Sequence, residues 1–451
     1  MLFILFMRIN VVGSKSKLVK HRSKEPGFVD LLIYASVVDE GVIVGKDGSL
    51  MAAWAYQGVD SNSSTEAERD QVSLQINHAL SRMGSGWMIH IDAVRKPAPG
   101  YCAKDDSHFP DPVSAAIDEE RREFFERVGT LYESNYVITA TYLPPLLAQQ
   151  KFVELMFDDE GVPVDSKTRT IALLNHFKRE CANIESHLSS VFRMKRLKGK
   201  TITKEDNSSV NYDAFLRWIQ FCISGLDHPV ILPKNPIYLD ALLSGQEFWG
   251  GVVPKIGQNF IQVVSIEGFP LASSPGLINS LADLPCLYRW STRFIFMDTH
   301  EAVGHLEKFS KKWKQKIRSF FDQVFNSHSS NVDQNAINMV SDAQAAIAET
   351  NSGEVAQGYY TSVVVLMSES RGDLEASARQ VAKAINHLGF TARIETINTI
   401  DAYLGSLPGH GVENVRRPLL NTMNLADLMP SNTVWPGKNE APCPMYPPMA
   451  A

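Results

Sequence analysis

The sequence has little of what marks a metal site, a disulfide framework or a nucleotide site. Its five cysteines lie far apart in 451 residues and form no Cys-x-x-Cys pair or Cys/His cluster, so a zinc site is not indicated. An odd, scattered number of cysteines is typical of a reducing compartment. The chain also contains no Gly-x-x-x-x-Gly-Lys-Ser/Thr segment, and no phosphate-binding loop can therefore be assigned.

Excess positive charge and long apolar runs are missing as well. Lys and Arg number 44 against 50 Asp and Glu, and the net charge is -6, so nucleic acid would have to be bound by a local patch. The segment Met1–Phe6 is apolar but too short to cross a bilayer, and it lacks the features of a signal peptide. We expect a globular, cytoplasmic chain. Two alternatives stay open for these residues, namely initiation at Met7 or a short strand or membrane-surface anchor.

The first 150 residues contain an α/β pattern. Two β-rich runs, 41–46 and 49–57, are joined through Asp-Gly, which predicts a hairpin at the edge of a first sheet. Ser63 and Glu66 have the spacing of a capping box at the start of a helix. A strand over 87–94, a helix over 118–131 and a strand over 136–142 complete a ββαβαβ order.

A helical region follows, and then a second α/β pattern. The apolar set at Leu374, Ala378, Val381 and Ile385 predicts a helix that faces a core. The expected elements of this pattern are strands over 260–266, 287–297, 362–367 and 390–395, helices over 277–282 and 373–388, and a long helical insertion over 299–350.

The fold class predicted from these patterns is α+β, with ferredoxin-like or RRM-like mixed sheets and packed helices in two α/β subdomains. The apolar content of 44% is enough for cores of this size. The expected organisation is an N-terminal segment over 1–30, a first subdomain over 31–150, a helical region over 151–232, a second subdomain over 233–404 and a linker over 405–451.

Several sequence fragments occur together in a recognisable order. Ser265–Pro270 reads Ser-Ile-Glu-Gly-Phe-Pro, and Leu284–Ile295 reads Leu-Pro-Cys-Leu-Tyr-Arg-Trp-Ser-Thr-Arg-Phe-Ile. Phe109–Val113, Thr141–Pro145 and Arg416–Leu419 extend the match over nearly the whole chain. With these fragments the chain closely resembles the N-terminal region of TrbE-type conjugal-transfer ATPases, within the CagE/TrbE/VirB family of type IV secretion motors.

The resemblance implies an ATPase at the cytoplasmic face of the bacterial inner membrane, which energises pilus assembly and substrate transfer. In that family the nucleotide site lies in a C-terminal RecA-like domain, and this chain ends where that domain would begin. We therefore expect the N-terminal, non-catalytic portion of such a protein, without catalytic, cofactor-binding or metal-binding residues. ATP and magnesium are expected only for a full-length protein.

The resemblance also implies partners. These are inner-membrane components of the secretion system and further copies of the same chain in the full assembly, with the protein held peripherally at the membrane and no specific signal for nucleic acid. Two alternatives stay open. One is a complete nucleotide-hydrolysing enzyme with an unrecognised site, and the other is a nucleic-acid-binding module.

Residues 306–324 predict a basic amphipathic helix, because apolar residues recur at helical spacing with cations mostly around the other face. The simplest interpretation is a packed helix with a solvated face. Docking onto anionic lipid or a partner, or contact with phosphates, is the alternative. Arg416 and Arg417 form a second cationic pair. This pair is a candidate contact for an acidic partner surface or a nucleotide, because the forked guanidinium group suits both. The candidate residues on the helix are Lys308, Lys311, Lys312, Lys316 and Arg318.

Two further patterns have both a functional and a structural interpretation. Tyr288 and Trp290 would share one face of a strand, opposite Arg289. An aromatic pair on such a sheet can stack bases as in an RRM, but core packing is favoured because helices are expected to cover the sheet. Asp118–Glu120 resemble paired carboxylates, and we interpret them as acidic residues in the first turn of the helix over 118–131.

Overall fold

The computed structural model describes residues 27–58, 60, 63–144, 166–203, 209–233, 237–270, 273–324, 334–414 and 416–433. For residues 166–170, 312–324 and 334–340 it describes the backbone alone.

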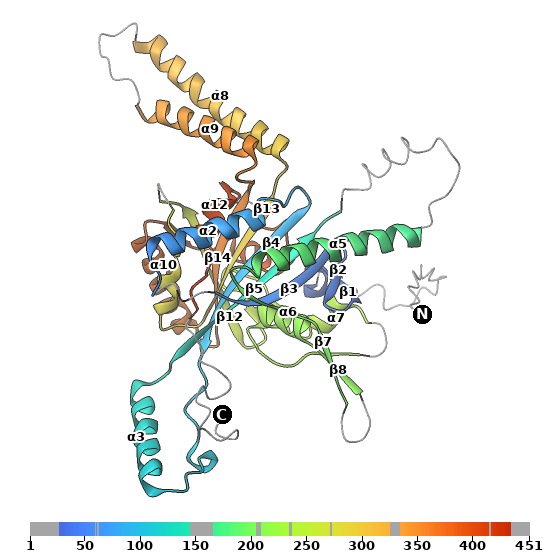
Figure 1. Cartoon of the computed structure of the whole chain (residues 1–451), viewed down its shortest axis with the longest axis vertical. Coiled ribbons are helices and arrows are strands. Elements are labelled where there is room, and N and C mark those ends of the chain that lie inside the picture. Colours follow the sequence, from blue (N-terminus) through green and yellow to red (C-terminus); the bar gives the residue numbers. More distant parts are fainter. Residues whose placement is uncertain are drawn as a thin grey trace.

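One large sheet runs through the described residues (Figure 1), and all of its pairings are antiparallel. Its path leads from β1 (Tyr34–Asp39) to β10 (Phe248–Trp249). The strands between these two are, in order across the sheet, β2 (Val42–Gly45), β3 (Leu50–Gln57), β5 (Tyr132–Tyr142), β4 (Trp87–Pro97), β13 (Tyr288–Phe296), β14 (Gln357–Ser368), β12 (Asn259–Gly268) and β11 (Lys255–Ile256). Three strands join its sides, namely β6 (Arg193–Arg196) beside β3, β15 (Thr391–Ile394) beside β12, and β16 (Leu419–Asn421) beside β14.

A first ferredoxin-like unit is formed by the elements from β3 to β6. Along the chain these are β3, α2 (Glu66–Leu80), β4, β5, α5 (Ser166–Leu188) and β6, and across the sheet the strands lie in the order β6-β3-β5-β4. Helix α3 (Pro112–Val128) is inserted between β4 and β5. We call these elements the first unit.

A second unit repeats this topology. Its elements are β12, the short 3-10 helix η3 (Asn279–Asp283), β13, β14, α10 (Arg371–His387) and β15, and its strands lie in the order β15-β12-β14-β13. Between β13 and β14 the chain forms a helical hairpin of α8 (Thr299–Val324) and α9 (Gln334–Ser352). The predicted ferredoxin-like α+β class is therefore confirmed, with antiparallel sheets where mixed ones were expected.

The two units join where β4 pairs with β13. Trp290 lies opposite Ala93 and Ser291 opposite Asp92, in antiparallel register. Each of these strands would be an exposed edge in an isolated unit, and pairing removes both edges. Because β4 and β13 have the same place in their units, the antiparallel pairing relates the units by an approximate two-fold axis. We call this line of pairing the seam.

The approximate symmetry explains the outline of the molecule in Figure 1. Helix α3 and the α8–α9 hairpin occupy the same topological position in their units, and they project from opposite ends of the sheet. The molecule therefore has two helical arms on one continuous sheet.

Helices cover both faces of the sheet. On one face α2, α5, α10 and α12 (Thr422–Asp427) pack in one core, and α10 uses the predicted set Leu374, Ala378, Val381 and Ile385. On the other face α6 (Ala214–Ser224), α7 (Leu239–Leu243) and α11 (Thr399–Leu404) form a second core. The central strands are consequently buried on both sides, as in β14, where both faces are apolar.

Several expected boundaries are corrected by the capping side chains. Helix α2 begins with a capping box of Thr65 and Glu68, two residues after the expected Ser63 and Glu66. Helix α3 begins at Pro112, after the N-cap residue Asp111. The first-turn interpretation of Asp118–Glu120 is therefore wrong, because proline at the first helical position starts the helix earlier.

Other strands were missing from the sequence expectation. At one end of the sheet the edge strand is β1, which pairs with β2 and lies outside the expected hairpin of β2 and β3. The expected helical region over 151–232 contains α5 and α6 but also β6 and a small separate sheet. This small sheet consists of β7 (Gly199–Thr203), β8 (Ser209–Asp213) and β9 (Ile231–Leu232). These strands are short and largely exposed, so they lack the apolar alternation on which strand prediction depends.

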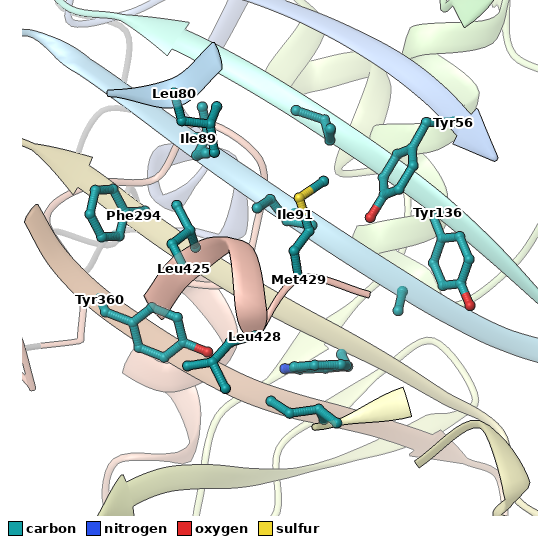
Figure 2. Packing of buried hydrophobic residues seen from close by; sticks show 14 of the residues in the cluster. Tyr56, Leu80, Ile89, Ile91, Tyr136, Phe294, Tyr360, Leu425, Leu428 and Met429 are labelled. Atoms are coloured by element: carbon teal, nitrogen blue, oxygen red, sulfur yellow. The ribbon is translucent and has the colours of Figure 1, made fainter. Parts of the chain in front are cut away.

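Residues 405–433 were expected to be part of a linker, and the structure corrects this. Leu407 lies in one core, whereas Leu425 and Met429 lie in the other, so this segment crosses from one face of the sheet to the opposite face. On the way β16 adds to β14. Figure 2 shows Leu425 beside Phe294, Leu428 beside Tyr360 and Met429 beside Ile91. We call residues 405–433 the strap.

Candidate functional site

The basic helix is confirmed as part of the α8 arm. Ala302 and Leu306 are buried, whereas Lys308 and Lys311 are exposed. Lys311 Nζ lies 3.3 Å from Glu307 Oε2, one turn earlier. For Lys312, Lys316 and Arg318 the structure describes a helical backbone, and their side chains lie outside the described residues. The beginning of α8 thus has one packed side and one charged side.

Arg416 and Arg417 have different surroundings. Arg416 Nη1 lies 2.9 Å from Glu267 Oε1 and also pairs with Glu395, whose side chain is buried. The exposed Arg417 donates from Nη2 to the carbonyl oxygen of Val412 at 3.0 Å. Arg416 therefore anchors the strap to β12 and the segment after β15. Contact with an acidic partner stays a prediction for Arg417.

The aromatic pair on β13 has the predicted common face but no free surface. Tyr288 and Trp290 are 7% and 2% exposed, and both belong to the core on the α10 side of the sheet. The Trp290 ring nitrogen donates to Ser362 Oγ at 2.6 Å. Core packing is confirmed, and base stacking on these two rings is excluded because helices cover them.

The opposite face of the seam carries a buried polar cluster that the sequence did not reveal. Arg289 Nη1 lies 2.8 Å from Asp92 Oδ1, and both side chains are almost fully buried. The same guanidinium donates to the carbonyl oxygen of Ser406 at 2.8 Å and to Ser406 Oγ at 2.6 Å. One ion pair thus joins β4, β13 and the strap.

A second arginine continues this attachment along β13. Arg293 is 1% exposed. It donates to the carbonyl oxygens of His410 at 3.0 Å, Glu413 at 2.7 Å and Asn414 at 3.1 Å. On β4, His90 Nε2 lies 3.3 Å from the carbonyl oxygen of Gly405. We call the set His90, Asp92, Arg289 and Arg293 with the strap residues that they contact the clamp.

Burial controls the electrostatics of the clamp. It lowers the pKa of His90 well below the usual value, and the positive charge of Arg293 lowers it further. Burial also raises the pKa of Asp92, although Arg289 acts in the opposite direction. The pKa of Arg293 falls to about 10 for the same reason, with Arg417 as an additional cause. Removing a charged group from water costs free energy, and the ion pairs and hydrogen bonds that the group makes in the fold must offset this cost.

The arginines of the clamp are directed at carbonyl oxygens and at one carboxylate, and these bonds hold β4, β13 and the strap together. Among the residues that the structure describes, no three His, Cys, Asp or Glu side chains come together to hold a metal ion. In the sequence, the clamp is signalled only by the alternation of His90 and Asp92 with Ile89 and Ile91 along β4.

Replacing Arg289 by methionine should destabilise the fold strongly, because Asp92 would remain buried without its partner. We expect R289M to lower the free energy of unfolding by about 3–5 kcal/mol, and D92N/R289M to recover much of that loss. Urea unfolding measures both values. K311M, which removes an exposed pair, should cost less than about 0.5 kcal/mol. A cost for R289M as small as that for K311M would contradict the clamp.

His90 should make the fold sensitive to acid. Its folded pKa is depressed, so below about pH 6.5 the unfolded chain binds a proton that the folded chain does not bind. Stability is therefore lost as the pH falls through this value. Between pH 7.5 and 5.5 the loss from this one residue is about 1.4 kcal/mol. Urea unfolding at pH 7.5 and at pH 5.5 measures the loss of unfolding free energy between the two pH values. This loss should be about 1.4 kcal/mol smaller for H90Q than for the wild type. Equal losses for the two proteins would refute the assignment to His90.

No helix in the described ranges is both long and apolar enough to cross a bilayer.

Two family models match the chain, and the matches contain β3 to β5 of the first unit and all elements of the second unit. Residues 41–150 match the N-terminal domain of the type IV secretion system ATPase VirB4/TrbE. Residues 200–416 match the CagE, TrbE, VirB family, described as a component of the type IV transporter system.

Similar relatives come from two rhizobial species. The conjugal transfer protein TrbE of Rhizobium radiobacter is 45% identical over 430 residues, which are 95% of this chain and 52% of that protein. In Sinorhizobium fredii (strain NBRC 101917 / NGR234), a probable conjugal transfer protein TrbE is divided into two polypeptides. The first of them is 49% identical over 127 residues, 28% of this chain and 85% of that polypeptide. The second is 45% identical over 273 residues, 60% of this chain and 41% of that polypeptide.

The chain thus spans about half the length of the Rhizobium radiobacter relative. The resemblance found in the sequence motifs is confirmed by the family matches and by these identities. The chain belongs to the CagE/TrbE/VirB family of type IV transporter components, in its conjugal-transfer TrbE branch.

Proposed function

We propose that these residues form the N-terminal, non-catalytic platform of a conjugal-transfer ATPase. The platform would contact other subunits and inner-membrane components of the secretion system during pilus assembly and substrate transfer. The observation that carries the proposal is the pair of helical arms, which project from opposite ends of one continuous sheet (Figure 1). A rigid body with two separated arms is suited to holding partners at defined positions.

The rigidity comes from the seam and the clamp. The sheet continues from the first unit into the second through β4 and β13, and the strap is hydrogen-bonded to both units. Near its end, Tyr56 and Tyr136 of the first unit donate to the carbonyl oxygens of Pro430 and Asn432 at 2.7 and 2.6 Å. The strap is therefore hydrogen-bonded to the first unit almost as far as Thr433.

The α8 arm is the proposed membrane contact. Helix α8 carries six Lys or Arg residues and three Asp or Glu residues in its sequence, and Lys308 and Lys311 are exposed at its base. Each cation near an anionic lipid surface contributes about 1 kcal/mol of attraction. Peripheral association at the cytoplasmic face of the inner membrane would follow from this charge.

Nucleotide hydrolysis would belong to another region of the full-length protein. No phosphate loop occurs in the sequence, and such a loop supplies the backbone N–H groups and the lysine that hold the phosphates. ATP and magnesium are then requirements of the full-length protein and not of these residues. The competing proposal is a complete nucleotide-hydrolysing enzyme.

Charge reversal on the α8 arm tests the membrane contact. K308E/K311E should weaken binding to vesicles that contain anionic lipid by at least about tenfold, because two attractive charges become repulsive. Co-sedimentation at physiological salt measures this. K200E/K383E changes the net charge equally at exposed sites on β7 and α10 and should bind like the wild type. If vesicle binding is weakened equally in both double variants, or is unchanged in both, the arm is rejected as the contact. K312E and K316E extend the series along the helix.

Calorimetric titration with magnesium-ATP separates the two proposals on nucleotide. Protein of residues 1–451 should give no saturable binding, because its sequence contains no phosphate loop. A P-loop ATPase titrated under the same conditions serves as the positive control. Saturable, magnesium-dependent binding to this chain would favour the complete enzyme instead.

A further inference from the structure

The arm around α3 has a packed inner side. Arg122 is 9% exposed, and its guanidinium lies 2.7 Å from Asp118 Oδ2 and also pairs with Glu119. It donates to the carbonyl oxygen of Cys102 at 3.2 Å, and the rings of Tyr101 and Phe125 stack with centroids 5.2 Å apart. The segment before α3 is therefore fastened to the helix, and the arm is a built structure.

The outer side of the same helix is apolar and exposed. Along α3, Val113, Ile117, Phe124 and Val128 follow one another at intervals of four, seven and four residues. These intervals place all four on one side of the helix. The large apolar residues exposed on the arm are Phe109, Val113, Ile117, Phe124, Val128 and Leu131, with exposed fractions between 43% and 65%. A contiguous apolar stripe of this kind on a soluble protein usually marks an interaction surface.

The second unit shows how the fold covers such a helix. There α8, inserted at the same topological position, packs along α9 in a hairpin (Figure 1). The first unit has α3 at this position, and among the described elements it carries the three-residue 3-10 helix η2 (Lys104–Asp106) at Glu119 but no second α-helix packed along it. A second α-helix is therefore the cover that the second unit uses at this position.

The spacing of the apolar residues in the stripe is the same from both ends of the helix. Val113 and Val128 are equally far along the chain from the midpoint between Glu120 and Arg121, and so are Ile117 and Phe124. If two copies of α3 pair antiparallel about this midpoint, Val113 meets Val128 and Ile117 meets Phe124 of the second copy. Each copy's Glu120 then meets Arg121 of the other, so opposite charges face each other twice.

We propose that the α3 arm is a homotypic docking site, in which two copies of this chain pair through antiparallel α3 helices. The contact is isologous, with a two-fold axis at the midpoint of the helix. A helix of 17 residues is about 25 Å long, so the interface is small and the dimer is of moderate affinity. The inference concerns the other arm and is independent of the proposed membrane contact.

The charges favour a second copy over a lipid surface. Helix α3 carries five acidic residues against three arginines, and an anionic membrane would repel this excess. Glu120 and Arg121 are both exposed at the centre of the stripe. A self-complementary partner satisfies both of them, whereas a purely apolar partner helix would bury each without an opposite charge.

Exchange of the central charges tests the pairing and its direction. Sedimentation equilibrium on protein of residues 1–451 should show a concentration-dependent dimer. E120R and R121E should each weaken it at least tenfold, because like charges then meet twice. The double variant E120R/R121E restores opposite charges and should return to within about threefold of the wild type. Failure of the double variant to recover would overturn the antiparallel pairing.

Apolar variants test whether the stripe is the contact. I117E should abolish the dimer, and L74E, at a similarly exposed leucine on α2, should leave it intact. Circular dichroism of each variant confirms that the helix is retained. A wild-type chain that stays monomeric up to high micromolar concentration, or a dimer that is insensitive to I117E, overturns the proposal. Vesicle binding of the α3 variants should be unchanged, which separates this test from that of the α8 arm.

Discussion

The structure depends on the pairing of β4 with β13 and on the buried ion pair that crosses it. The strand pairing joins two units that would each expose an edge strand. The Asp92–Arg289 pair then links the same two strands to Ser406 of the strap. Buried charges of this kind contribute little net stability as a pair but are costly to separate. The pair therefore acts mainly as a requirement that both strands and the strap assemble in one arrangement.

The approximate two-fold relation between the units accounts for the position of the arms. In both units the insertion lies between the second and third strands, so antiparallel joining sends the arms to opposite ends (Figure 1). The arms differ in charge and cover, since α8 is basic and packs on α9, whereas α3 is acidic and exposes an apolar stripe. One sheet therefore presents two surfaces of different chemistry at its opposite ends.

The helix of the α8 lysines is predictable because helical periodicity and charge occur within one segment, and the common face of Tyr288 and Trp290 follows from strand alternation. A membrane or partner contact of the lysines stays a prediction. The clamp was missed because Asp92, Arg289 and Ser406 are separated by more than a hundred residues. The strap has the composition of a linker, since glycine and proline are frequent in loops, and only the tertiary structure shows that it packs on both faces of the sheet.

The sequence by itself determined the family, the α+β class and most helices and strands, because caps, turns and apolar periodicity act over a few residues. Tertiary structure alone decided that the two units share one sheet, that Arg416 is held by Glu267 and Glu395, and that the α3 stripe remains exposed. These features depend on which distant segments meet. Desolvation and ion pairing are set by that meeting, and no local pattern encodes it.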